Sequence, residues 1–269
     1  MKSPFSFVTV SAVATFAFLY IPLLCVAAFS VNASKFGLNW GGFTWNWYRK
    51  MIENEAILQA ALNTLFLGIV STAISTVLGT MLAIGMYRFP WKRKSINKLE
   101  TLLHLPVVTP DIIFAVALVI AFSVIRHFTG FFELGMTSMI FGHVAFQISF
   151  VALTVKARLA LIGTDIEEAA CDLYASYPRV LTKVLLPMLA PGIMAGAMLA
   201  FTLSLDDFVI SFFTSGPKST TLPLLIYASV KRGVTPEIHA LSTIIMLLTI
   251  FCVIVLQRIT YHRKQQENL

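Results

Sequence analysis

The chain has 269 residues, of which 57% are hydrophobic and only 12% are charged. Soluble domains carry about 25% charged residues, so this composition excludes a water-soluble enzyme, a secreted disulfide scaffold and a disordered segment. The net charge of +7 indicates basic loops beside anionic lipid rather than a nucleic-acid-binding surface. The three cysteines are far apart and form no disulfide or metal-binding pattern. The composition therefore predicts an integral membrane protein with no resident metal and no nucleic-acid partner.

Six apolar runs are each long enough to cross the hydrocarbon core as a helix, which takes about 20 residues. They cover residues 7–31, 59–86, 101–125, 136–157, 188–214 and 239–259. The first run is too long for the apolar part of a secretory signal, and only Lys2 precedes it as a charge, so we expect it to remain as a span. The sequence thus predicts an all-α membrane protein with six transmembrane helices in a single domain over residues 1–269.

The distribution of Lys and Arg predicts the orientation of these spans. The N-terminus, 88–100, 156–187 and the C-terminus hold 13 of the 20 basic residues, and the segments on the other side hold 7. The basic cluster 92–94 lies in a short loop, where the positive-inside rule is most reliable. We therefore expect both termini to be cytoplasmic. Segment 32–58 should face outward and place an aromatic group at the membrane–water boundary, made of Trp40, Trp45, Trp47 and Tyr48.

Several motifs that carry enzyme chemistry are missing from the sequence. No glycine is followed two residues later by serine, no histidine is followed by glutamate, and there is no Gly-Lys pair. These absences remove the nucleophilic-serine motif, the zinc-protease motif and the phosphate-binding loop of an ATPase. We expect that the chain is not itself an enzyme and that any ATP hydrolysis takes place in another polypeptide.

The cytoplasmic loop 158–187 predicts a short amphipathic helix. Thr164 as the N-cap, with Glu167 three residues later, has the pattern of a capping box, and Pro178 ends or restarts the helix. One face holds Ile166, Ala170 and Leu173, and another holds Glu168 and Asp172. Such a helix could lie on lipid or bind a protein. Its acidic residues favour a protein with a basic pocket, because anionic lipid would repel them.

The same loop carries a spaced pattern. Glu168-Ala169-Ala170 is followed, after fixed intervals, by Tyr174 and then by Val184, Leu186 and Pro187. The pattern resembles the EAA loop of ABC importer permeases, in which a glycine stands where this chain has Tyr174. A glycine permits a left-handed turn there, which would cost a tyrosine about 1–2 kcal/mol. Either Tyr174 adopts this turn or the helix runs on to Tyr177.

The resemblance extends along nearly the whole chain. The segments that carry it are Ser34-Lys35-Phe36-Gly37 with Trp47-Tyr48, Ser204-Leu205-Asp206-Asp207 with Ser215-Gly216-Pro217, and Thr235-Pro236-Glu237. They are similar to the spermidine/putrescine importer permeases, and more to the second permease of that system, its C subunit, than to the first. The resemblance implies the type I ABC importer permease fold, forming half of a polyamine pathway in the bacterial inner membrane.

The resemblance also implies partners and roles. It implies a second related permease, two copies of a cytoplasmic ATPase that binds ATP and Mg²⁺, and a periplasmic polyamine-binding protein, with no cofactor on this chain. In that family the EAA loop binds the ATPase. The residues to which this role is carried over are Glu167, Glu168, Ala169, Ala170, Asp172, Tyr174, Leu186 and Pro187.

Three aspartates lie within the predicted spans, where each costs about 2.5–3.5 kcal/mol unless it faces a cavity or a partner. Asp111 is expected near the midplane, and Asp206 and Asp207 in the outer third of the fifth span. We interpret these three as candidates for the path of a cationic cargo, with Tyr20 as an aromatic contact for its ammonium groups.

Structural roles for these aspartates remain open. Asp207 shares a polar stripe with Ser204 and Ser211, which favours it, with Asp111, as a path residue, whereas Asp206 points about 100° away and could bond a neighbouring helix. Alternatively, both Asp206 and Asp207 could be buried contacts between helices. Asp111 follows two prolines and could lie at the start of a broken helix. The neutral polar residues of the spans are interpreted as hydrogen-bonding partners between helices; they are Asn63, His104, His143 and Gln147.

Two other functions remain possible from the sequence. A proton-coupled secondary transporter would use the same aspartates but would not need an ATPase-binding helix, and a membrane scaffold would not need the aspartates. Within the ABC class, the cargo could be another small cationic solute. An anion fits poorly, because no Lys or Arg lies deep in a span.

Overall fold

The structure, a computed structural model, describes residues 7–34, 39–130, 133–233 and 235–267, with side chains up to residue 251. The secondary structure of the described chain is helical, as predicted, apart from connecting loops and one isolated bridge between Asn32 and Phe43. The helices are α1 (Phe7–Ser30), α2 (Asn46–Glu53), α3 (Glu55–Arg88), α4 (Arg93–Val108), α5 (Asp111–Thr129), α6 (Met136–Ala160), α7 (Asp165–Asp172), α8 (Tyr177–Val180), η1 (Leu181–Leu185), α9 (Leu186–Asp206), α10 (Val209–Thr214), α11 (Leu222–Arg232) and α12 (Pro236–Glu267).

Five helices of the described residues are long and apolar enough to span a membrane. They are α1, α3, α5, α6 and the continuous helix Tyr177–Asp206. In α12 the apolar stretch with described side chains runs from Pro236 to Phe251, which is shorter than a span. A helical protein with several membrane-spanning helices is therefore confirmed, and the sixth span and the orientation of the termini stay predictions.

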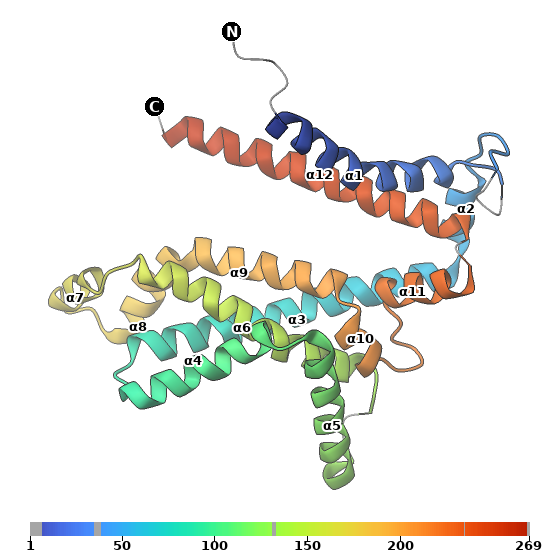
Figure 1. The fold of residues 1–269 in the computed structure, drawn as a ribbon. Helices are drawn as coiled ribbons and strands as arrows, with labels where there is room; N and C mark the ends of the chain where they lie inside the picture. The colour runs from blue at the N-terminus through green and yellow to red at the C-terminus, as the bar shows by residue number, and fades with distance from the viewer. Residues whose placement is uncertain (1–6, 35–38, 131–132, 234, 268–269) are drawn as a thin grey trace. The chain divides into compact units, whose positions relative to one another are not determined.

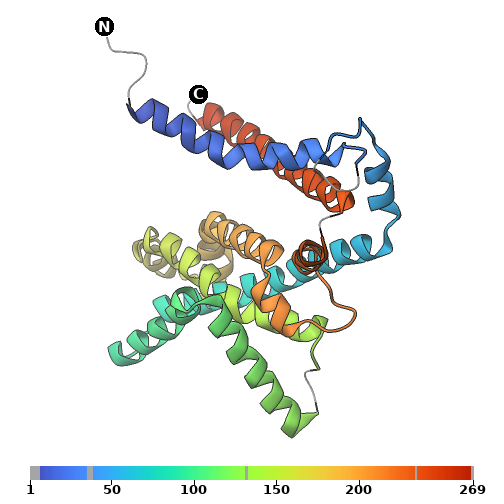
Figure 2. The same cartoon turned by 45° about the vertical axis from the view of Figure 1, so that its right-hand side comes forward.

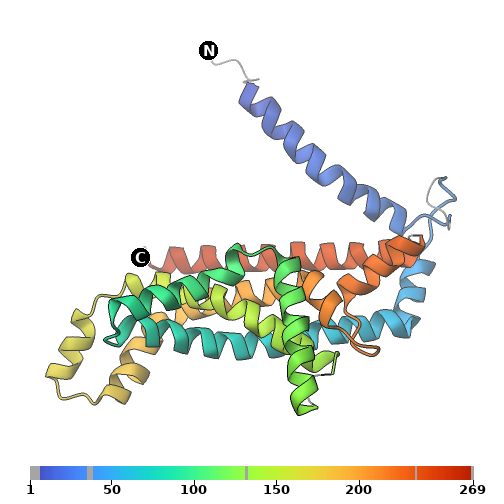
Figure 3. The same ribbon diagram turned by 60° about the horizontal axis from the view of Figure 1, so that its bottom comes forward.

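The helices form two compact units, one of Gln59–Leu225 and one of the residues up to Leu58 together with those from Ile226 onward. In the first unit, α3, α4, α6 and α9 lie side by side, with α6 packed most extensively against α9 (Figure 1). Their core is aliphatic; its fully enclosed members include Ala83, Val151, Ala152, Val155, Leu189 and Ala200. At one end of this bundle the α7–α8 hairpin projects beyond the other helices (Figure 3).

Close approach of α3, α6 and α9 depends on two glycines that flank Val151. A side chain at Gly79 would begin 2.8 Å from the Cβ of Val151, and one at Gly196 would begin 3.3 Å from its Cγ1. Small residues allow membrane helices to pack closely, where dispersion contacts replace the hydrophobic effect. Val151 of α6 is fully buried between the two neighbouring helices. This packing fixes the frame that carries the polar residues described below.

The predicted third span, 101–125, is wrong as a single helix. It is divided between α4 and α5, and α5 runs away from the direction of α3, α6 and α9 (Figure 2). The break falls at Thr109, which is extended (φ −72°, ψ 134°) because the ring of Pro110 disfavours the helical conformation of the preceding residue. α5 then ends at Gly130, which takes the left-handed conformation (φ +73°) common after a helix.

In the second unit, α1 and α12 pack together and α2 packs on α12. α1 and α12 lie close where α1 ends and diverge toward the chain termini (Figure 3). The loop between α1 and α2 is organised by the buried Asn32, whose Oδ1 accepts the N–H groups of Ser34 and Gly41. The indole of Trp47 donates to the carbonyl of Asn32 at 2.7 Å. Lys35, Phe36 and Gly37, part of the family-like segment, lie outside the described residues.

Candidate functional site: a buried polar cluster and an exposed acidic hairpin

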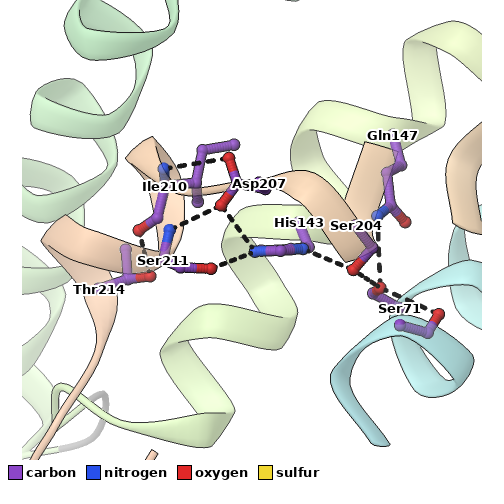
Figure 4. Close-up of polar contacts among 9 residues, drawn as sticks. Ser71, His143, Gln147, Ser204, Asp207, Ile210, Ser211 and Thr214 are labelled. Atoms are coloured by element: carbon purple, nitrogen blue, oxygen red, sulfur yellow. Dashed lines mark hydrogen bonds and ion pairs between the residues drawn. The ribbon is translucent and has the colours of Figure 1, made fainter. Parts of the chain in front are cut away.

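A buried histidine of the first unit joins three helices, α6, α9 and α10. The ring of His143, on α6, is 1% exposed and lies between two serines (Figure 4). Its Nδ1 is 2.8 Å from the hydroxyl of Ser204 on α9, and its Nε2 is 3.1 Å from the hydroxyl of Ser211 on α10. Nε2 also lies 3.2 Å from a carboxylate oxygen of Asp207. A carboxylate can only accept a hydrogen bond, so Nε2 carries the proton that faces it.

Asp207 also starts the short helix α10. One carboxylate oxygen accepts the N–H of Ile210 at 3.2 Å, and the other accepts the N–H of Ser211 at 2.8 Å. The backbone of Asp207 is extended (ψ 120°), so α9 ends just before it. Aspartate favours such breaks because its side chain satisfies N–H groups that would otherwise lack acceptors. The predicted unbroken span 188–214 is therefore wrong, whereas its polar stripe of Ser204, Asp207 and Ser211 does converge on one neighbour, His143.

The cluster continues from α9 to α3. The hydroxyl of Ser204 lies 3.3 Å from that of Ser71, which accepts a hydrogen bond from the side chain of Gln147. The oxygen of Gln147 accepts the hydroxyl of Ser75 at 3.0 Å. His143 and Gln147 are one turn apart on α6, and the two serines are one turn apart on α3. The prediction that His143 and Gln147 bond neighbouring helices is confirmed.

The other two polar residues behave differently. The amide of Asn63 donates to the carbonyls of Lys218 and Thr220, so it ties α3 to the loop before α11. Among the described residues, His104 bonds only within its own helix, where Nδ1 lies 2.7 Å from the carbonyl of Glu100, and it is exposed. The interpretation of His104 as a contact between helices is not supported by this geometry.

The remaining cargo-path candidates are exposed. Asp206, the last residue of α9, is exposed and has no side-chain partner among the described residues. Asp111 is the first residue of α5 and not in the middle of a span. This position agrees with the alternative that Asp111 lies at the start of a broken helix. Tyr20 lies on α1 with 56% of its surface exposed, stacked at 6.3 Å on Phe16. The structure thus separates Asp207, which is enclosed, from three side chains that remain accessible.

In the EAA-like loop, α7 ends in a left-handed turn at Tyr174. The N–H of Ala175 donates to the carbonyl of Ala170, and the N–H of Tyr174 donates to that of Cys171, which is the Schellman pattern. Tyr174 has φ +60° and is the one non-glycine residue of the described chain with a positive φ. The alternative of a helix that runs on to Tyr177 is therefore wrong. The turn leaves the Tyr174 ring 97% exposed.

The predicted capping box does not form. Thr164 is helical in backbone conformation (φ −71°, ψ −20°), and its side chain makes no cap hydrogen bond. Glu167 instead turns inward and forms an ion pair with Arg88, at 2.7 Å between Oε1 and Nε. Both side chains are largely enclosed, with 12% of Arg88 and 17% of Glu167 exposed. Sequence reasoning treated Arg88 only as one basic residue among several at the cytoplasmic side.

The other residues of the loop lie on the surface or in the helix that follows. Glu168, Ala169 and Asp172 are exposed on α7, and no residue of α7 is buried. Leu173 is 82% exposed, so the predicted apolar face is uncovered in this chain. Leu186 and Pro187 start α9, half-buried and exposed respectively, after the π-helical segment η1. The hairpin therefore presents acidic and apolar side chains together.

A second ion pair in the first unit joins α6 to α4. The ammonium of Lys156 is 2.6 Å from a carboxylate oxygen of Glu100 and 4.5 Å from the ring centre of Tyr87. The hydroxyl of Tyr87 donates to the same oxygen at 2.8 Å. The hydrogen bond from Lys156, with that from Tyr87, lowers the pKa of Glu100. The contacts join α3, α4 and α6.

These features can be compared with known proteins. The helices match a chain of a bacterial ABC transporter for the import of the acidic polysaccharide alginate, with a TM-score of 0.75 and 15% identity over 95% of this chain and 94% of that one. A methionine ABC transporter in inward-facing conformations matches with a TM-score of 0.59 and 19% identity over 76% of this chain and 95% of that one. The fold is thus that of a membrane chain of an ABC transporter.

Sequence similarity defines the family. The sequence model of one protein family, described as the inner membrane component of binding-protein-dependent transport systems, matches residues 75–266. The chain belongs to this family. It is 39% identical to the spermidine/putrescine transport system permease protein PotC of Escherichia coli, over 91% of this chain and 90% of that protein. It is 39% identical to the putrescine permease PotI of the same species, over 86% and 82%. The sulfate permease CysT of Salmonella typhimurium is 30% identical, over 80% and 81%.

Proposed function

We propose that this chain is one permease subunit of an ATP-driven importer and forms half of the membrane pathway for spermidine or putrescine. The observation that carries the proposal is the 39% identity, over nearly the whole chain, to permeases named for these polyamines. The relative named for sulfate is more distant, at 30% identity. The exposed acidic side chain at the end of α9 fits a cationic cargo better than an anionic one.

Within this function we assign the cargo contact to Asp206 rather than to Asp207. The carboxylate of Asp207 already accepts two backbone N–H groups and faces His143, so its charge is used by the protein itself. Asp206 is exposed and carries no competing cation among the described residues. A carboxylate in a water-poor path attracts an ammonium group strongly because the local dielectric is low. Asp111 and Tyr20 are further, accessible candidates along the path.

We propose that α7 and its turn bind a cytoplasmic ATPase. The hairpin exposes Glu168, Asp172 and the ring of Tyr174, which suits a partner with a basic, partly apolar groove. The expected assembly contains this chain, a second related permease, two ATPase copies that bind ATP and Mg²⁺, and a periplasmic polyamine-binding protein. In this assembly both termini of the chain face the cytoplasm of a bacterial cell. Closure of the ATPase pair would move α7 and switch access across the membrane.

The test is uptake by the complete importer in vesicles. We expect labelled spermidine or putrescine to enter only with ATP and binding protein, and not with a proton gradient alone. Uptake driven by the gradient without ATP would identify a secondary transporter instead. Asp206→Asn should raise the KM about tenfold, as expected for the loss of one hydrogen bond to a charged group. Glu100→Gln, which removes a partly exposed charge from α4, outside the proposed cargo and ATPase contacts, is the control and should leave the KM unchanged.

A further inference from the structure

We propose that Arg88 and Glu167 form a rigid link that carries the movement of α7 to the membrane helices α3 and α6. The inference rests on the proposed function, because it assumes that a partner ATPase moves α7. It assigns to Arg88 and Glu167 a positioning role in coupling, distinct from the surface residues that would touch the ATPase.

The geometry places Arg88 at a junction of three helices. Arg88 is the last residue of α3, and its Nε lies 2.7 Å from Glu167 in the first turn of α7. Its Nη2 donates to the carbonyl of Ile162 at 2.8 Å and lies 3.5 Å from that of Leu159, at the end of α6. One guanidinium therefore holds the end of α3, the end of α6 and the start of α7.

The type of side chain explains why this junction is stiff. A guanidinium is planar and always charged, so its N–H groups can donate to carbonyls on one edge while its charge pairs with a carboxylate on another. Between Arg88 and Glu167 the contact is an ion pair without hydrogen-bond alignment. The enclosure of both side chains reduces screening of the ion pair by water. Cations are also favoured at the carbonyl end of a helix, and carboxylates at the N-terminal end. Both conditions are met, since Arg88 donates to carbonyls at the end of α6 and Glu167 lies in the first turn of α7.

The link adds to a connection that α7 has through the chain. α7 packs against α8 and η1, which lead directly into α9. Without Arg88, movement of α7 would reach α9 through these contacts but would reach α3 and α6 less directly. With the ion pair, the three helices that frame the buried polar cluster all receive the displacement. Elements that link two sites in this way can alter the coupling between them by a factor of about 2–30.

The test measures the number of cargo molecules imported per ATP hydrolysed, using the complete importer in vesicles with labelled putrescine. Glu167→Gln and Arg88→Gln should each lower this ratio about 2- to 30-fold, while the ATPase still co-purifies and hydrolyses ATP. Because the ratio is normalised to hydrolysis, loss of folded protein alone does not change it. The double variant should be no worse than the more affected single variant, since both remove the same interaction.

Controls separate the link from a general effect of charge. Glu100→Gln breaks the ion pair of Lys156 with Glu100, which does not involve α7, and should keep the wild-type ratio. If Glu167→Gln does not assemble, Arg88→Lys keeps the charge without the planar fork and should still lower the ratio. An assembled Glu167→Gln or Arg88→Lys complex with the wild-type ratio overturns the proposal, as does an additive loss in the double variant.

A second readout is independent of the cargo. The periplasmic binding protein should stimulate ATP hydrolysis by the partner ATPase. This effect must pass through the same helices, from the outer side of the membrane to α7. It should fall by a similar factor in Glu167→Gln. If the wild-type importer transports no polyamine, the proposed cargo is wrong, but this stimulation still tests the link.

Discussion

Two regions of the first unit each contain adjacent acidic residues, and in each region the two neighbours have opposite environments. At the break between α9 and α10, Asp207 is enclosed and Asp206 is exposed. On α7, Glu167 is enclosed and Glu168 is exposed. The inward carboxylate has a fixed cationic or N–H partner in both regions. The outward carboxylate has no cationic partner among the described residues, so it remains available to a cargo or a partner protein.

The difference follows from helix geometry and the cost of burial. Successive residues on a helix point about 100° apart, which lets Glu167 turn inward while Glu168 faces outward. At the other region the helix ends at Asp206, and Asp207 has an extended backbone. An enclosed carboxylate is tolerated only when ionic or hydrogen-bonding partners compensate its lost hydration. The position that meets a partner inside the protein therefore has a structural role.

The largest expected effect is at Asp207. Asp207→Ala leaves two N–H groups of α10 without acceptors and removes the carboxylate that faces His143. Loss of one partner of a buried pair costs about 3–5 kcal/mol in free energy of unfolding. Thermal unfolding of the purified permease should show this as a large fall in Tm. Asp206→Ala is the matched control and should change stability by less than about 0.5 kcal/mol, as for other surface sites. Equal losses at the two positions would contradict the division.

The next effect concerns the exposed neighbour on α7. Glu168→Lys reverses a charge that makes no contact within the described chain, so the permease should fold and insert normally. Binding of the ATPase should weaken by about 2 kcal/mol, as for an interface charge placed against a basic pocket. The measurement is the amount of ATPase that co-purifies at increasing salt. Wild-type binding by Glu168→Lys would show that the outward carboxylate does not face the ATPase.

How far the sequence predicts these regions depends on the range of the interaction. The spans, the α7 helix, the restart at Pro178 and the shared face of Ser204, Asp207 and Ser211 follow from patterns within about 20 residues. The ion pair of Arg88 with Glu167 joins residues 79 positions apart, and no local pattern indicates it. The sequence pattern around Glu167 also fits a capping box with Thr164. In the structure Glu167 pairs with the guanidinium of Arg88 instead.

The two wrong spans have a shared cause. Hydropathy averages over about 20 residues and does not detect a single residue that leaves the helical conformation. Thr109 is extended because of Pro110, and Asp207 because its side chain caps the next helix. The prolines before Asp111 were visible in the sequence. Whether Asp207 would face the path or a neighbouring helix depended on His143, 64 residues earlier in the chain.

A smaller effect is expected at Tyr174, whose left-handed backbone is costly for a residue with a side chain. Tyr174→Gly should stabilise the isolated permease by about 1 kcal/mol, because glycine adopts this conformation without strain. If the exposed ring fills a groove of the ATPase, the same change should weaken assembly by about 1–3 kcal/mol. Unfolding of the permease alone and ATPase binding measure the two terms separately. A loss of permease stability would show that the ring has a structural contact within the chain.

The smallest effect is expected at Glu100, which is intermediate between the two extremes because its side chain is 34% exposed and yet paired with Lys156. The pKa of Glu100 is lowered in the folded protein by the hydrogen bonds from Lys156 and Tyr87. A lowered folded-state pKa means that the stabilisation is complete above the ordinary value of 4.5 and is lost as the pH falls below it. Glu100→Gln should remove this part of the acid dependence and leave stability at pH 7 slightly reduced. Unfolding of the wild type and of Glu100→Gln between about pH 3 and 7 makes the comparison. If the wild type and Glu100→Gln lose stability in parallel as the pH falls, the ion pair with Lys156 contributes nothing to the stability of the fold. Glu100 would then resemble the exposed carboxylates of Asp206 and Glu168.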